Sequence, residues 1–83
     1  MVGINFHGVN LSGADLSGAN LCGANLSFQN FSGSNLTKAD LRGANLERAN
    51  LEKANLTGAN LGGANLNGAK LSGAIMPDGT VHD

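Results

Sequence analysis

Apolar residues recur at every fifth position along this chain, from Phe6 to Met76. Around each apolar centre the sequence repeats one pattern: a mostly small residue two positions before it, a mostly polar residue directly before it, and two variable residues after it. The stretch at 43–66, GANLERANLEKANLTGANLGGANL, contains this pattern five times. The centres are Phe6, Leu11, Leu16, Leu21, Leu26, Phe31, Leu36, Leu41, Leu46, Leu51, Leu56, Leu61, Leu66, Leu71 and Met76.

A period of five excludes both a regular α-helix and a continuous flat strand. A step of five residues rotates by about 140° on a helix, so the apolar centres would spread around its whole circumference. In a flat strand, successive centres would fall on opposite faces. A short extended segment followed by a two-residue bend fits, because Ala and Leu then share one side. If every bend has the same sense, the chain winds into a coil with Ala and Leu inside.

The second residue after each centre is usually Gly, which predicts a type II turn with a positive φ at that position. Four corners carry a different residue there, and we expect another turn type at each of them. These corner residues are Phe28, Lys38, Arg48 and Lys53.

The consecutive ADL and ANL units over 4–76 resemble those of pentapeptide repeat proteins. The resemblance implies an all-β fold, a right-handed quadrilateral β-helix with four units per coil and about four coils. The chain is then one domain, 1–83, with repeat units at 4–76 and a C-terminal turn and tail at 77–83. Pro77, Asp78 and Gly79 form the turn that stops the winding. At about 4.8 Å per coil, the column would be about 18 Å tall.

With four units per coil, residues twenty apart stack, and all four ladders of centres are apolar. The structural core is then expected to include Phe6, Leu26, Phe31, Leu46, Leu51 and Leu66. Gln29 and Ser34 replace the small inward Ala, so we expect them to bond to the backbone or to a trapped water. The outward Asn side chains are expected to support the turns, in preference to stacking as an amide ladder.

Composition argues against an active site. The net charge is −1, and Cys22 is the single cysteine. His7, Cys22 and His82 lie too far apart for a metal cluster, and a filled shaft offers no cleft, so we expect no metal, cofactor, small-molecule substrate or enzymatic activity. Cys22 is expected to be an exposed thiol. Nothing resembles a signal peptide or membrane span, which favours the cytoplasm.

The charged residues concentrate in the middle of the repeats. Seven of the eleven lie within 38–53, with both signs interspersed. Glu47 and Glu52, beside Arg48 and Lys53, are expected to form solvated salt bridges in a belt that blocks lateral aggregation. Phe28 should face outward with Arg48 one coil above it, which makes this pair the best candidate for a surface interaction site.

Three functional hypotheses follow. A structural or protein-interaction module, with an unknown protein partner, needs the fewest assumptions. The resemblance also raises DNA mimicry directed at a type II topoisomerase, but the near-neutral charge and short length disfavour it, and nucleic acid is not an expected ligand. Binding to ice or another lattice would need more Thr rungs than Thr37 and Thr57 provide. An end-to-end homodimer through the C-terminal coil is expected, because Ile75, Met76 and Val81 make that end apolar.

Overall fold

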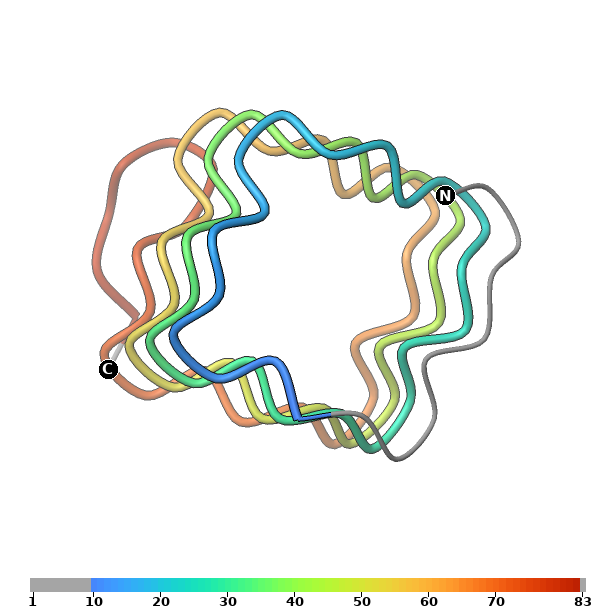
Figure 1. The fold of residues 1–83 in the computed structure, drawn as a ribbon, viewed down its shortest axis with the longest axis horizontal. Helices are drawn as coiled ribbons and strands as arrows, with labels where there is room; N and C mark the ends of the chain where they lie inside the picture. The colour runs from blue at the N-terminus through green and yellow to red at the C-terminus, as the bar shows by residue number, and fades with distance from the viewer. Residues whose placement is uncertain (1–9, 83) are drawn as a thin grey trace.

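The computed structural model describes residues 10–82, which wind as a four-sided coil (Figure 1). Parallel bridges join residues twenty apart, from Asn10–Asn30 through Asn55–Ile75, so each coil takes up four five-residue units. The strand pairing over 10–82 consists of isolated one-residue bridges, and no helix occurs in this range. It therefore holds no helix long and apolar enough to cross a membrane. The molecule measures 28 × 22 × 20 Å, and Figure 1 looks down the shortest of these axes.

Backbone hydrogen bonds connect each coil to the next at every unit. From Leu11 to Leu56, each Leu or Phe centre donates its N–H to a carbonyl nineteen residues ahead, as in Leu26 N–H to Asn45 O at 2.8 Å. The corner residue does the same to a carbonyl nineteen ahead of it, as in Phe28 to Glu47 at 2.9 Å. The bond in the opposite direction runs from Asn45 N–H down to Ala24 O at 2.9 Å. A coil therefore needs a neighbour above and below to satisfy its backbone.

All described repeat corners share one backbone conformation. Glycine corners have φ near +70°, and the non-glycine corners Phe28, Lys38, Arg48 and Lys53 have φ of 61°, 60°, 56° and 60°. The residue after each corner donates its N–H to the carbonyl of the preceding centre, as in Ala49 N–H to Leu46 O at 3.0 Å. The expectation of a different turn is therefore wrong in both φ and hydrogen bonding. A bond from each of these N–H groups to the next coil, as in Lys38 N–H to Thr57 O at 2.9 Å, holds the four residues in the left-handed region despite the steric penalty of a Cβ there.

The shaft is filled by the apolar centres and the small residues before them. Leu26, Phe31, Leu46 and Leu51 are at most 1% exposed. Leu66 packs against this cluster but is only partly buried, because it lies in the last coil with no further coil above it. Phe6 lies outside the described residues.

Gln29 and Ser34 bring polar atoms into the shaft without hydrogen-bond partners. Both residues are 1% exposed, and Gln29 Oε1, Gln29 Nε2 and Ser34 Oγ make no hydrogen bond within the described range. The expected bonds to the backbone are therefore absent, since inter-coil bonds already use the backbone groups around these side chains. A trapped water remains a prediction. Without such a water, Gln29 and Ser34 weaken an otherwise apolar column.

The tail ends the winding by reversing direction. Gly79 donates its N–H to Met76 O at 2.8 Å, which closes the expected turn at 77–79. Val81 then forms an antiparallel bridge with Ile75, and His82 N–H donates to Ala74 O at 2.7 Å. The tail covers one side of the last coil and leaves the other three uncovered.

Candidate functional site

The outer surface is built mainly from Asn side chains that brace the corners. Each Asn Oδ1 accepts the N–H of the residue two positions ahead, as in Ser12 N–H to Asn10 Oδ1 at 3.0 Å. A Ser or Thr at that position adds its hydroxyl, as in Thr57 Oγ1 to Asn55 Oδ1 at 2.6 Å. The expected turn support is confirmed. One amide rung also occurs, from Asn65 Nδ2 to Asn45 Oδ1 at 3.4 Å.

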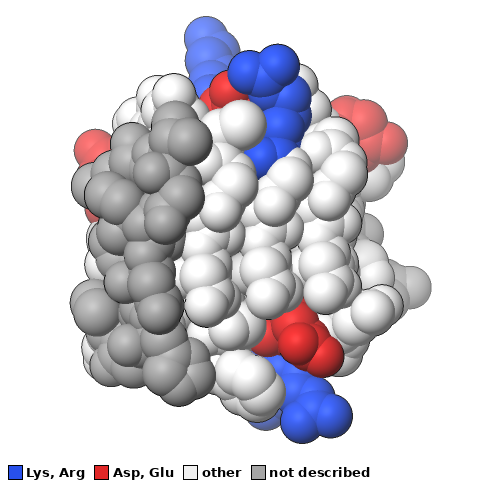
Figure 2. All heavy atoms as spheres, turned by 90° about the vertical axis from the view of Figure 1, so that its right-hand side faces the viewer, with Lys and Arg blue, Asp and Glu red and all other residues white. Residues whose placement is uncertain are grey.

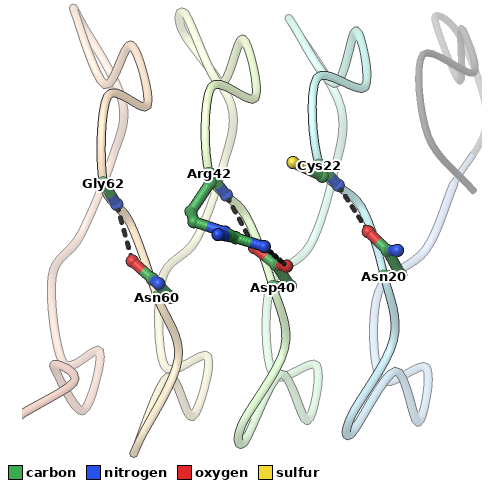
Figure 3. A network of polar contacts seen from close by, with 6 residues as sticks. All are labelled: Asn20, Cys22, Asp40, Arg42, Asn60 and Gly62. Carbon is green, nitrogen blue, oxygen red and sulfur yellow. Dashed lines mark hydrogen bonds and ion pairs between the residues drawn. The ribbon is translucent and has the colours of Figure 1, made fainter.

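Asp40 and Arg42 form the one ion pair among residues 10–82, with Arg42 Nη2 at 2.7 Å from Asp40 Oδ2 (Figure 3). The Arg42 side chain, followed by the Arg42 N–H, donates to the carboxylate and lowers the pKa of Asp40. The hydroxyl and N–H of Ser17 lower the pKa of Asp15 in the same way. The salt bridges expected of Glu47 and Glu52 with Arg48 and Lys53 do not occur within residues 10–82.

The charges nevertheless form the expected belt, since each corner of the coil spanning 37–56 carries one cation: Lys38, Arg42, Arg48 and Lys53. Figure 2 shows one side of the molecule, where charged atoms gather at the two edges and leave the middle uncharged. Both signs occur at these edges. The face shown in Figure 2 therefore has no continuous acidic stripe of the kind that a DNA mimic needs.

Phe28 and Arg48 meet on the outer surface, one coil apart. The Phe28 side chain is 53% exposed, and the guanidinium carbon of Arg48 lies 5.7 Å from the centre of its ring, which is cation–π geometry. Gly68, one coil higher, makes room for Arg48: a Cβ at Gly68 would lie 3.0 Å from Arg48 Cγ. The hydrogen bond that closes the turn at Phe28, from Gln29 N–H to Leu26 O, is 3.4 Å long and is the longest such bond among the described corners.

The next corner along the chain contributes Lys53 to the same side of the molecule. We define the Asn30–Lys70 side as residues 28–33, 48–53 and 68–73, which stack through the bridges Asn30–Asn50 and Asn50–Lys70. It lies at the bottom of Figure 1, where the coloured trace begins at Asn10. An open hollow of about 520 Å³ at one edge is lined in part by Ser32, Asn50, Glu52, Lys53 and Ser72.

The sequence pattern predicts the pairing of Phe28 with Arg48, and the structure adds Lys53 and Lys70 to the same side. Lys70 stands where most units have Asn or Asp, so Ser72 N–H has no side-chain oxygen at that position to donate to, as the equivalent N–H does at the other corners, for example Glu52 N–H to Asn50 Oδ1. Positions 28, 48, 53 and 70 fall on one side once a period of twenty is applied to the sequence. The sequence contains this grouping, but it can be recognised only when residues twenty apart are aligned as one side of the coil.

The residues of known metal or redox chemistry do not assemble into a site within 10–82. No group of three His, Cys, Asp or Glu side chains in this range is placed to hold a metal ion. Cys22, expected to be exposed, is half-buried, with Arg42 in the next coil at the same corner (Figure 3). His7 lies outside the described residues. Between residues 10 and 82, the arrangement offers a contact surface and no constellation for covalent or acid–base chemistry.

Comparison with known proteins gives one consistent result. A family profile for pentapeptide repeats matches residues 1–37 and 34–73, with eight copies of the repeat. Among solved structures, the chain is similar to HetL, a protein involved in heterocyst differentiation regulation from the cyanobacterium Nostoc sp. strain PCC 7120. It is 48% identical to HetL with a TM-score of 0.92, and the match covers 94% of this chain and 36% of HetL.

The pentapeptide repeat protein Rfr23 from the cyanobacterium Cyanothece 51142 is 42% identical, with a TM-score of 0.56, over 95% of this chain and 57% of Rfr23. The chain thus spans about a third of HetL and somewhat over half of Rfr23. Among curated protein sequences, none matches. The repeat profile, the twenty-residue coil and these solved structures together establish that the chain belongs to the pentapeptide repeat family.

Proposed function

We propose that this chain is a non-enzymatic protein-interaction module, a right-handed quadrilateral β-helix of about four coils that presents fixed side chains to a protein partner. The observation that carries the proposal is the exposed Phe28 ring with the Arg48 guanidinium 5.7 Å from its centre. Aromatic and Arg side chains dominate the binding energy of protein interfaces. The surrounding coil holds both in position, so little conformational entropy is lost on binding.

Backbone strain supports a role for this pair beyond stability. Phe28 and Arg48 both have positive φ, and glycine would adopt this conformation without the steric penalty of a Cβ. Strained residues of this kind cluster at sites where function maintains them. HetL is involved in heterocyst differentiation regulation, and a regulatory protein of this architecture would act through contacts on its outer surface.

An end-to-end homodimer through the C-terminal coil belongs to the same proposal. The N–H groups of Leu61, Gly63, Leu66 and Gly68 have no acceptor among the described residues, whereas Leu41 and Leu46, one coil below, donate to Asn60 and Asn65. Unpaired edge groups of this kind favour pairing with another chain. Light scattering tests this point, because a strict monomer at high concentration would refute it.

The interaction proposal is tested by comparing three baits in an affinity capture: the unchanged chain, Phe28→Gly and Lys38→Gly. Both substitutions place Gly at a strained corner, but only the first removes the exposed ring. A specific partner should be retained by the unchanged chain and by Lys38→Gly, and lost with Phe28→Gly. Equal recovery by all three baits, or no specific protein with any of them, would contradict the proposal.

A further inference from the structure

We infer that the Asn30–Lys70 side binds an acidic segment of a protein partner, whose carboxylates meet Arg48, Lys53 and Lys70 and whose apolar side chain packs on Phe28. The inference rests on the proposed interaction function and names the chemistry of its partner. It enlarges the contact from one corner to a whole side of the column.

Outward positions that lack the usual residue of the repeat concentrate on this side. Six outward positions of the described repeats lack the corner glycine or the bracing Asn or Asp: Phe28, Lys38, Arg48, Lys53, Lys70 and Ile75. Ile75 pairs with the tail, which explains it. Four of the remaining five lie on the Asn30–Lys70 side. Each gives up a local stabilising feature, either the glycine that suits positive φ or the side-chain bond to a turn N–H.

The Asn30–Lys70 side carries more positive charge than the rest of the coil. The Asn30–Lys70 side and the corner residue Glu47 together carry three cations, Arg48, Lys53 and Lys70, against the two carboxylates Glu47 and Glu52, a net charge of +1. The other described residues carry two cations, Lys38 and Arg42, against three carboxylates, Asp15, Asp40 and Asp78. The side is therefore positive on a molecule whose net charge is −1.

Arg48, Lys53 and Lys70 form no ion pair with other side chains of residues 10–82. Arg42, by contrast, is paired with Asp40. Arg48 has its guanidinium carbon 5.7 Å from the centre of the Phe28 ring and forms no ion pair within 10–82, so its N–H donors can serve a carboxylate. The hollow beside Lys53 gives a partner side chain room to reach the ammonium group.

A protein segment fits this surface better than a nucleic acid. The cations alternate with Glu47 and Glu52, which would repel a continuous row of phosphates. Separate carboxylates on a peptide can pair with Arg48, Lys53 and Lys70 while avoiding the two glutamates. The half-exposed Phe28 ring also offers apolar contact to a side chain beside such a carboxylate.

The test uses fluorescence anisotropy with a fluorescein-labelled peptide of alternating Glu and Leu as the probe. The same peptide with Gln in place of Glu, and a single-stranded oligonucleotide of equal charge, serve as comparison probes. The protein variants are Phe28→Gly/Arg48→Gly/Lys53→Gly and, as the matched control, Lys38→Gly. Each substitution installs the residue that the other corners already use, so these variants should fold.

The acidic peptide should bind the unchanged chain, and the triple variant should bind at least about tenfold more weakly. Lys38→Gly, which removes the strain of one corner and one cation elsewhere, should change the affinity by less than about twofold. Equal loss with Lys38→Gly, equal binding of the Gln peptide, tighter binding of the oligonucleotide, or no binding of the acidic peptide would overturn the inference.

The peptide titration and the affinity capture fail separately. If the chain captures a partner through Phe28 but does not bind the acidic peptide, only the inference that the partner segment is acidic would be overturned. Peptide binding at this side without a captured partner would count against the proposed function alone.

Discussion

The middle coil and the last coil of this column repeat the same motif but differ in burial. Leu41, Leu46 and Leu51 are at most 1% exposed, whereas Leu61, Leu66 and Leu71, directly above them, are only partly buried. Within the last coil, Ala74 is fully buried under the antiparallel tail, while Ala64 and Ala69 on uncovered sides are not. Burial thus depends on the neighbours stacked above and below and not on the motif itself, since Leu11 and Leu16 at the other end are also only partly buried.

This difference indicates that stability belongs to the contacts between coils. A repeat array of this kind gains most of its stability from nearest-neighbour interfaces, so the same side chain contributes more in the middle than at an end. The outer positions follow a related rule, because the non-glycine corners Lys38, Arg48 and Lys53 each donate their N–H to a carbonyl of the coil above. The predictions below test these contrasts.

The largest expected effect is the loss of a buried centre. Leu46→Ala should lower the free energy of unfolding by about 2 to 5 kcal/mol, because it leaves a cavity between two coils. Leu66→Ala, one coil higher, should cost less than half as much, since water already reaches that side chain. Chemical denaturation measures both. Equal losses at the two positions would show that the last coil is as well covered as the middle one.

Removing a buried polar group should have the opposite sign. Ser34→Ala should stabilise the fold by about 1 kcal/mol, because Ser34 Oγ is buried without a partner and Ala occupies the same inward position at Ala54 and Ala74. The reverse change, Ala54→Ser, should destabilise by a similar amount. A loss of stability in Ser34→Ala would instead indicate that the hydroxyl binds a trapped water.

Exchanging glycine and non-glycine residues at the corners should change the stability of the fold by a smaller amount. Lys38→Gly should stabilise the fold by about 1 kcal/mol, since glycine adopts φ near +60° without the steric penalty of a Cβ. Gly43→Ala should destabilise by about the same amount through φ alone, because a Cβ there would meet nothing within 4 Å. Thermal unfolding reports both changes. Unchanged stability in the two variants would mean that these corners store no strain.

The smallest expected effect is the pH response of the bracing aspartates. The bonds from Arg42 lower the pKa of Asp40 in the folded state, so this carboxylate stabilises the fold above its unfolded pKa. That contribution is lost as the pH falls through the folded pKa. Asp40→Asn keeps an acceptor for the Arg42 N–H and should flatten this part of the acid dependence. An NMR titration that gives Asp40 an ordinary pKa would contradict the assignment.

The sequence predicted which side chains face inward, because that depends on the local alternation within each unit. It could not predict that Phe28, Lys38, Arg48 and Lys53 keep the corner conformation of glycine. That conformation is imposed by inter-coil bonds to residues distant in sequence, such as Phe28 N–H to Glu47 O. The partial exposure of Leu66 and the return of the tail across Ile75 depend on where stacking stops, which the motif does not encode.

The candidate site shows the same division. The Phe28–Arg48 pair was accessible from the sequence because the two residues are twenty apart and both replace Gly. The Asn30–Lys70 side required the closed coil, since Lys53 and Lys70 join it from different units. The unpaired state of Gln29 and Ser34 depends on whether the surrounding backbone groups are already bonded, which only the packed shaft reveals.

The most direct test of the coil is a set of solution NMR contacts between backbone groups about twenty residues apart. The account predicts cross-peaks from the amide of Leu26 to the Hα of Asn45 and from the amide of Leu46 to the Hα of Asn65, following the bonds between these residues. Contacts at separations near fifteen or twenty-five residues, or sequential amide contacts typical of a helix, would contradict it.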